Sequence, residues 1–447
     1  MAGAASALWA TRYNGTGNDD DSAIDVVVSP DGSSVFVTGL SLGSASARDW
    51  DYATTAYDAS TGAELWAHRY AGSGDDWDVP TALGLSPDGS AVYVTGASMG
   101  ATSGFDAVTV AYDAATGASL WERRFDSRSN DADANNDSGD ALAVSPDGSV
   151  VFVTGDSDRG GSMYITIAID AATGRRLWLK RYNDPVNDYD NAWAIGVSPD
   201  GSAVFVAGTN GSDDTERNDW NTVAYDSSTG ALLWTERHNG PLDGQDQVTA
   251  LGVSPDGSTL FVTGTSADQF DRATYATVAF DAATGAKVWA RRYHAARTRV
   301  DYASSLSVSP DGSAVFVTGT SVGSATTDED WVTVAYDAST GATLWANRYN
   351  GRADGPDWTS EVATSPDGST VFVGGSRFGS RTSGDLATVA YDADTGTRLW
   401  VKAYNGRANR SEGGGAIGVS PDGSRLFVTG TSFGAARYDY VTLAYAV

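Results

Sequence analysis

Residues 56–66 read Ala-Tyr-Asp-Ala-Ser-Thr-Gly-Ala-Glu-Leu-Trp, and related stretches recur along the whole chain of 447 residues. The tryptophans that end these stretches are 55 to 57 residues apart. They are Trp9, Trp66, Trp121, Trp178, Trp234, Trp289, Trp345 and Trp400. Eight copies of one unit predict a repeat architecture in which each unit is a small supersecondary structure.

The repeated stretch has the chemistry of a β-hairpin. A β-branched and aromatic run such as 106–113 precedes each turn and is typical of a half-buried strand. In the Asp-x-x-Thr-Gly turn, the Asp and Thr side chains bond nearby backbone N–H groups and the Gly accepts a positive φ. The tryptophan follows on the next strand, where its large ring predicts a wedge between neighbouring units.

A second turn completes each unit. Pro presets φ for a type I turn, and the Asp and Gly that follow it suit the same turn. The motif Ser-Pro-Asp-Gly begins at Ser29, Ser86, Ser145, Ser198, Ser254, Ser309, Ser365 and Ser420. Each unit therefore has four strands, one before and one after each turn. No stretch has the 3.6-residue apolar period of a helix.

Tandem four-stranded antiparallel units predict an all-β protein, a single eight-bladed β-propeller over residues 1–447. The sequence begins with a lone fourth strand, 8–13, and ends with a lone third strand, 439–445. We expect the N-terminal strand to complete the last blade, because this pairing removes two open edges. The predicted blades are 18–72, 73–127, 128–184, 185–240, 241–295, 296–351, 352–407, and 408–447 with 1–15.

The pattern Ala-x-Asp-x-x-Thr-Gly-x-x-x-Trp resembles the tryptophan-docking motif of the eight-bladed quinoprotein-like (PQQ-like) propellers. The match is intact at 56–66, 111–121, 168–178, 224–234, 279–289, 335–345 and 390–400. The sequence is also similar to secreted bacterial propeller-repeat proteins of unassigned activity. Quinoprotein dehydrogenases carry a vicinal cysteine pair over their cofactor, and this sequence has no cysteine. The resemblance therefore implies the fold and argues against PQQ chemistry.

Composition excludes several function classes. The net charge of −28 argues against binding to nucleic acid or to anionic membrane surfaces. Without cysteine there is no thiolate metal site or thiol nucleophile. No segment has the roughly 20 apolar residues of a membrane span, and no signal peptide is recognisable. By resemblance we expect a secreted or cell-surface monomer whose leader is absent from this sequence.

A carboxylate stands eight residues before every Ser-Pro-Asp-Gly, at the start of the first strand of each blade. The set is Asp21, Asp78, Asp137, Asp190, Asp246, Asp301, Asp357 and Glu412. We expect these groups to form a ring near the mouth of the central channel. They either cap backbone N–H groups of the adjoining turns or hold a hard cation such as Ca²⁺, which takes oxygen ligands.

A second set of aspartates opens the third strand of six blades, where the sequence favours a turn-stabilising role. These residues are Asp51, Asp106, Asp219, Asp330, Asp385 and Asp439, and the series is interrupted at Met163 and Thr274. Paired with the first set, they would instead bracket shallow sites between blades.

Six tryptophans lie outside the docking set, and five of them adjoin an acidic residue. They are Trp50, Trp77, Trp193, Trp220, Trp331 and Trp358, all near the variable loops. Flat rings beside carboxylates are typical of sugar-binding sites, although packing beneath long loops explains them equally well. Function usually resides on such loops, which a rigid frame holds in place.

Asp25 and Glu361 replace the usual Ala or Ser four residues before Ser-Pro-Asp-Gly. Ionisable groups on the strand nearest the axis are candidates for perturbed catalytic carboxyls. They are either a proton-transfer pair or charged groups facing channel water.

These patterns favour a non-catalytic secreted binding module that takes a glycan or small molecule on an acidic, Trp-bearing face, with Ca²⁺ as a possible ligand. The alternatives are an enzyme in the central pocket, such as a polysaccharide lyase or a lactonase-like hydrolase, and a purely structural propeller. A lyase acting on a uronic acid needs a base and a positive charge to offset that of the substrate. Tyr302 with Arg297 and Arg299 is the only group near the channel mouth that the sequence offers for these roles.

Overall fold

A computed structural model gives the structure of the chain and contains only strands, turns and loops in the part that it describes. The described residues are 7–44, 47–74, 77–101, 104–127, 136–158, 162–183, 189–211, 218–240, 244–267, 273–294, 300–322, 329–351, 355–379, 382–406, 410–434 and 436–447. Within them, no helix is long and apolar enough to cross a membrane.

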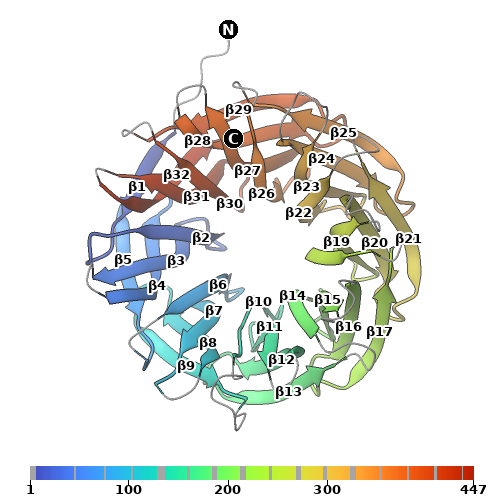
Figure 1. Ribbon diagram of the computed structural model, residues 1–447, viewed down its shortest axis with the longest axis horizontal. Helices are drawn as coiled ribbons and strands as arrows, with labels where there is room; N and C mark the ends of the chain where they lie inside the picture. Colours follow the sequence, from blue (N-terminus) through green and yellow to red (C-terminus); the bar gives the residue numbers. More distant parts are fainter. Residues whose placement is uncertain are drawn as a thin grey trace.

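The strands form eight antiparallel blades of four strands, as the repeat predicted (Figure 1). Blades 1 and 2 contain β2 (Asp21–Val28), β3 (Ser34–Ser44), β4 (Ala47–Asp58), β5 (Glu64–Tyr70), β6 (Asp78–Leu85), β7 (Ala91–Met99), β8 (Phe105–Asp113) and β9 (Ser119–Phe125). Blades 3 and 4 contain β10 (Ala141–Val144), β11 (Val150–Asp158), β12 (Ser162–Asp170), β13 (Arg176–Tyr182), β14 (Tyr189–Val197), β15 (Ala203–Gly211), β16 (Asp219–Asp226) and β17 (Leu232–His238). A single parallel bridge between Ser162 and Tyr189 joins these two blades into one eight-stranded sheet.

The other four blades follow the same plan. Blades 5 and 6 contain β18 (Asp246–Val253), β19 (Thr259–Ala267), β20 (Ala273–Asp281), β21 (Lys287–Tyr293), β22 (Asp301–Val308), β23 (Ala314–Val322), β24 (Glu329–Asp337) and β25 (Thr343–Tyr349). Blades 7 and 8 contain β26 (Trp358–Thr364), β27 (Thr370–Gly379), β28 (Thr382–Asp392), β29 (Arg398–Tyr404), β30 (Glu412–Val419), β31 (Arg425–Phe433), β32 (Tyr438–Ala446) and β1 (Trp9–Tyr13).

The N-terminal strand closes the ring. Strand β1 pairs antiparallel with β32, in a register that runs from Trp9 opposite Ala444 to Tyr13 opposite Tyr440. The first strand of each blade also contacts the first strand of the next blade, and β30 contacts β2. We call these eight strands (β2, β6, β10, β14, β18, β22, β26 and β30) the inner strands, because they lie nearest the axis of the ring (Figure 1).

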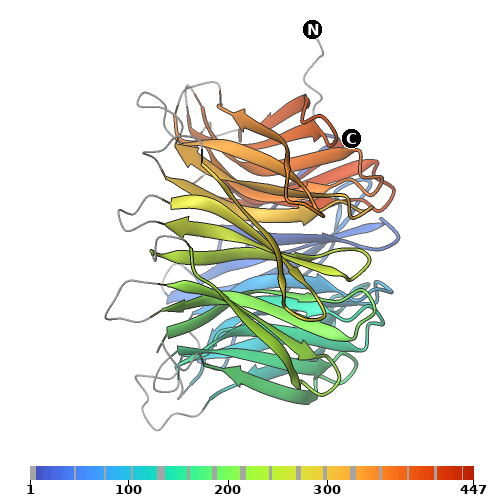
Figure 2. The same cartoon turned by 90° about the vertical axis from the view of Figure 1, so that its right-hand side faces the viewer.

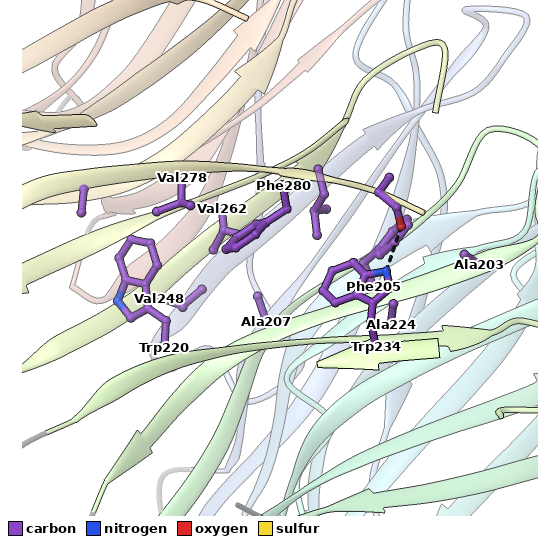
Figure 3. Close-up of a cluster of buried hydrophobic side chains, with 13 residues drawn as sticks. Ala203, Phe205, Ala207, Trp220, Ala224, Trp234, Val248, Val262, Val278 and Phe280 are labelled. Atoms are coloured by element: carbon purple, nitrogen blue, oxygen red, sulfur yellow. Dashed lines mark hydrogen bonds between the residues drawn. The ribbon is translucent and has the colours of Figure 1, made fainter. Parts of the chain in front are cut away.

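The docking tryptophans join each blade to the next. The Trp234 ring packs between blades 4 and 5, and its Nε1 donates a hydrogen bond of 2.9 Å to the carbonyl oxygen of Ala282 (Figure 3). Gly285, with a φ of +76°, lies against the ring so closely that a Cβ there would meet Cε3 at 2.7 Å. The same type of bond joins Trp9 to Ala59, Trp66 to Ala114, Trp121 to Ala171, Trp178 to Ser227, Trp289 to Ala338 and Trp345 to Ala393. The eight hydrophobic clusters of the core lie between neighbouring blades.

Candidate functional site

The two faces of the ring differ. The Ser-Pro-Asp-Gly and Asp-x-x-Thr-Gly turns lie together on one face, on the right in Figure 2. We call this the turn face, and the opposite one, where the inner strands begin, the loop face. The Asp of each turn accepts hydrogen bonds from neighbouring Ser, Thr and backbone groups; Asp31, for example, bonds Ser29 and Ser33. The variable loops 128–135, 212–217, 268–272 and 323–328, like Arg297 and Arg299, lie outside the described residues.

The eight carboxylates that begin the inner strands are buried, not open to the channel mouth. Each is at most 2% exposed. Backbone N–H groups of the adjoining turns donate to them, from Gly15 to Asp21, Gly72 to Asp78, Ser127 to Asp137, Gly240 to Asp246, Gly351 to Asp357 and Gly406 to Glu412. Asp190 and Asp301 are buried to the same degree and also interact with neighbouring groups. Six of the eight carboxylates therefore cap backbone N–H groups.

The eight carboxylates do not lie close enough together to form one set of ligands for a cation. Among the described residues, only one group of three metal-ligating side chains has ligand atoms within 4.8 Å of one another, and it contains just one of the eight, Asp137. Burial raises the pKa of Asp21 and of Asp357 to about 6 each and that of Glu412 to about 7. These shifts follow from desolvation, which disfavours the charged form and which the hydrogen bonds only partly offset.

The second set of aspartates forms ion pairs across the outer strands. Asp106 accepts a hydrogen bond of 2.8 Å from Nη1 of Arg124. Equivalent pairs join Asp51 to Arg69, Asp219 to Arg237, Asp330 to Arg348 and Asp439 to Arg12. In blade 7, where Ala403 replaces the arginine, Arg377 on β27 pairs with Asp385 instead. Sequence reasoning missed these arginines, although an Arg three residues after seven of the eight docking tryptophans was a visible signal.

One junction between blades gathers an additional acid. Asp106 and Asp137, together with Asp126 at the end of the outer strand of blade 2, place three carboxylate oxygens within 4.8 Å of one another. The other junctions have Asn, Ala or His in place of Asp126. Arg124 balances one of the three charges, so this group, which we call the acid triad, is a set of oxygen ligands suited to a hard cation.

The structure divides the six extra tryptophans, and two of them cannot serve as ligand-binding residues. Trp220 and Trp331 are 1% exposed and belong to the hydrophobic core (Figure 3 shows Trp220). They occupy the third-strand position that follows the second set of aspartates. Other blades place buried aromatics there, namely Tyr52, Tyr164, Tyr275 and Tyr440. That recurrence was the sequence signal for a core role.

Three of the remaining tryptophans are exposed at the inner strands. Trp77, just before β6, is 44% exposed, Trp193 on β14 is 41% exposed, and Trp358 on β26 is 48% exposed. Trp50 is partly buried. Tyr189 and Tyr302, also on inner strands, are exposed to a similar degree. Because all five lie on or directly beside inner strands, we call Trp77, Tyr189, Trp193, Tyr302 and Trp358 the aromatic rim.

Asp25 and Glu361 each accept a hydrogen bond from the backbone of the next blade, which the sequence did not reveal. Seven of the eight inner strands carry a bulge, β10 being the exception. Each of these two carboxyls accepts a backbone N–H that follows the bulge of the next blade's inner strand. Oδ2 of Asp25 accepts from the N–H of Leu83 at 2.9 Å, and Oε2 of Glu361 accepts from that of Ile417 at 2.7 Å. Burial raises the pKa of Asp25 to about 6. Burial and, next, the charge of Asp25 raise the pKa of Glu361 to about 8.

The raised pKa of Glu361 gives a testable pH dependence. A carboxyl whose pKa is higher in the folded state contributes stability below its unfolded pKa, and this stability is lost as pH rises through the folded value. Glu361→Gln is therefore expected to gain stability relative to the native protein between pH 5 and pH 9. We expect about 1–2 kcal/mol, because the side chain is partly exposed. Urea unfolding at both pH values measures this difference, with exposed Glu64→Gln as control; a pH-independent difference would contradict the account.

Two clefts are described on the turn face, where no sequence-predicted site residue lies. One of about 460 Å³ lies between blades 1 and 2 and includes Pro30, Asp31 and Asp88. The other, of about 570 Å³, lies between blades 2 and 3 and includes Pro87 and Asp147. Both clefts are lined by the Ser-Pro-Asp-Gly turns of two neighbouring blades, so they result from the repeated turns and do not mark a separate site.

A family model described as outer membrane protein assembly factor BamB matches residues 51–212, 165–328, 217–412 and 328–439. No curated protein matches the chain. Among solved structures, BamB from Moraxella catarrhalis is similar, with 17% sequence identity, a TM-score of 0.54, and coverage of 98% of this chain and 99% of that one.

Two further solved structures have the same fold. Chaetomium thermophilum Sqt1 bound to the N-terminus of the ribosomal protein L10 is 15% identical with a TM-score of 0.59, and 98% of each chain is covered. Quinohemoprotein alcohol dehydrogenase from Comamonas testosteroni is 14% identical with a TM-score of 0.57. That match covers 98% of this chain and 76% of the dehydrogenase. At these identities the likeness concerns the fold alone.

Proposed function

Since the chain belongs to the PQQ_2 family, the family described as outer membrane protein assembly factor BamB, we propose that it is a non-catalytic binding module. Its ligand docks on the loop face at the aromatic rim. The observation that carries this proposal is the exposure of Trp77 beside β6, Trp193 on β14 and Trp358 on β26. Large aromatic rings left in water on a rigid frame are typical of binding surfaces.

The two candidate catalytic carboxyls support a binding role over a catalytic one. Asp25 and Glu361 both accept backbone hydrogen bonds from the next blade, which gives each a role in joining blades. Propellers of this fold include both kinds of protein, since one solved relative is bound to the N-terminus of the ribosomal protein L10 and another is an alcohol dehydrogenase. An enzyme in the central pocket remains the alternative, and turnover lost in Glu361→Gln would favour it.

A carbohydrate is the first ligand to test at the aromatic rim. Sugar rings present C–H faces that stack on indole, and the stacked contact buries the apolar surface of the large ring. We expect glycan-array binding, with affinity reduced about tenfold by Trp193→Ala or Trp358→Ala. Leu65→Ala, at an exposed position on β5, is the matched control. Binding that survives both tryptophan variants would place the ligand elsewhere.

The proposal includes Ca²⁺ at the acid triad. Its support is the three carboxylate oxygens that lie within 4.8 Å of one another, which a hard cation could bridge. Ca²⁺ at a hundred times its dissociation constant is expected to stabilise the fold by about 2.7 kcal/mol. Thermal unfolding in Ca²⁺ and in a chelator measures this shift, and Asp126→Asn is expected to abolish it while Glu64→Gln leaves it. An equal melting temperature in both conditions would contradict the site.

The proposal also includes secretion and a monomeric state. Their support is the resemblance of the repeat to secreted bacterial propeller proteins and the pairing of β1 with β32, which covers the edge that β32 would otherwise expose. Fractionation of the source cells and light scattering of the purified protein test these two points.

A further inference from the structure

The inner strand of blade 3 is interrupted. Strand β10 has four residues, whereas the other seven inner strands have seven to nine. An isolated bridge joins Asp137 to Ser157 ahead of β10, and residues 138–140 lie between this bridge and the strand. We call residues 138–140 the blade 3 break. Side-chain contacts have a larger share in holding it than they have in the continuous inner strands.

Two aspartates meet at the blade 3 break. Asp140 stands five residues before the Ser-Pro-Asp-Gly motif of its blade, and Asp156 stands eleven residues after the first residue of that motif. In the other seven blades neither position has an ionisable side chain; blade 6, for example, has Ser304 and Thr320. The pair is therefore a feature of this blade alone and not part of the common frame.

The hydroxyl of Ser138 lies between the two carboxyls. Its Oγ is 2.9 Å from each carboxyl oxygen of Asp140 and 2.5 Å from Oδ1 of Asp156. A hydroxyl has one hydrogen to donate, so it cannot satisfy two charged carboxylates at once. One of the two acids must then carry a proton and donate it to the hydroxyl or to the other acid, because like charges at one site cannot both ionise freely.

The strands packed against β10 bring no basic side chain to this pair. These strands are β6, β7, β11 and β14. Burial and, next, the charge of Asp156 raise the pKa of Asp140 to about 8, so the proton stays on the pair at neutral pH. The titratable side chains of the four strands are Asp78, Tyr93, Asp156, Asp158, Tyr189 and Asp190.

The blade 3 break is also bonded to blade 2. The Gly139 N–H donates to the carbonyl oxygen of Gly96 at 3.3 Å, and the Thr81 hydroxyl donates to the carbonyl oxygen of Gly139. The fit is close, since a Cβ on Gly139 would meet Oγ1 of Thr95 at 2.4 Å. Repulsion between two charged acids would displace Asp140, which adjoins Gly139, and would strain these bonds between blades.

We infer that Asp140 and Asp156 share one proton across Ser138, and that loss of this proton releases the blade 3 break from blade 2. The ring then has one junction that responds to pH. This inference goes beyond the proposed binding function and does not depend on it. A carboxyl whose pKa is raised in the folded state contributes stability at low pH, and this stability is lost as pH rises through the folded value. The junction is therefore closed below about pH 8 and opens above it.

Amide hydrogen exchange of the full-length protein at pH 6 and pH 9.5, corrected for the intrinsic exchange rate, tests this inference. Local opening is expected to lower the protection of residues 138–142 about tenfold at pH 9.5. The equivalent stretch of blade 6, residues 302–306, is expected to change less than about twofold. Asp140→Asn cannot ionise and is expected to keep its protection at both pH values. Asp394→Asn removes one charge from an exposed outer turn and is expected to respond as the native protein does.

The outcomes decide the inference in either direction. Asp156→Asn removes the same shared proton from the other acid, and it replaces Asp140→Asn if that variant does not fold. Equal protection of residues 138–142 at both pH values in the native protein would overturn the inference. An equal loss in Asp140→Asn would overturn it as well, and so would a loss shared by residues 302–306, which would indicate general alkaline unfolding.

Discussion

Trp234→Ala is expected to lower the free energy of unfolding by about 3–5 kcal/mol, the usual cost of removing a buried aromatic ring. The indole fills the junction of blades 4 and 5, with ring centroids 5.9 Å from Phe205 and 6.4 Å from Phe280 (Figure 3). The variant also leaves the Ala282 carbonyl without its donor and opens a gap against Gly285.

Chemical denaturation measures this effect, and Trp358→Ala is the control. Trp358 is exposed, so its removal is expected to cost less than about 0.5 kcal/mol, as for most surface substitutions. Equal costs for the two variants would contradict the wedge role of the docking tryptophans. Trp234→Phe should recover part of the loss, because it restores ring volume but not the hydrogen bond.

Deleting residues 1–13 is expected to have the largest effect, the loss of the cooperatively folded monomer. The deletion removes β1 and uncovers the edge of β32, and open edges pair with other chains. It also removes three contacts: the Trp9 ring 5.8 Å from Phe427, the Tyr13 ring 5.1 Å from Tyr440, and the ion pair of Arg12 with Asp439.

Size-exclusion chromatography and thermal unfolding check the deletion. We expect oligomers or aggregates and a broad transition in place of a single one. A synthetic peptide of residues 7–15 added in trans is expected to restore part of the monomer peak. A truncated protein that stays monomeric and melts as before would show that β1 is not part of the closing blade.

The fold could be predicted from the sequence because each blade repeats the same local rules. Two turn motifs, one tryptophan and a fixed spacing specify four strands, and the ends of the chain specify their own pairing. The capping role of Asp21 and its equivalents was also among the expectations, since a residue that recurs in every blade has a role in every blade.

The candidate site was less predictable, because it depends on how exposed each side chain is. Trp331 and Trp358 have the same acidic neighbours in sequence, yet one is buried in the core and the other is exposed. Trp331 lies on the third strand of its blade, where side chains pack between blades. Trp358 lies at the start of an inner strand, where its side chain is exposed to solvent. The hydrogen bond from Ile417 to Glu361 and the acid triad join different blades, so no local pattern could reveal them.

The closed ring is the claim on which every placement depends, and one cross-link tests it most directly. Thr11 and Thr442 are register partners on β1 and β32, and the native chain has no cysteine to compete. The account predicts that Thr11→Cys/Thr442→Cys oxidises to an intramolecular disulfide in the monomer and raises the stability, by up to about 5 kcal/mol for so long a loop. Free thiols after oxidation, or disulfide-linked dimers alone, would contradict the closure.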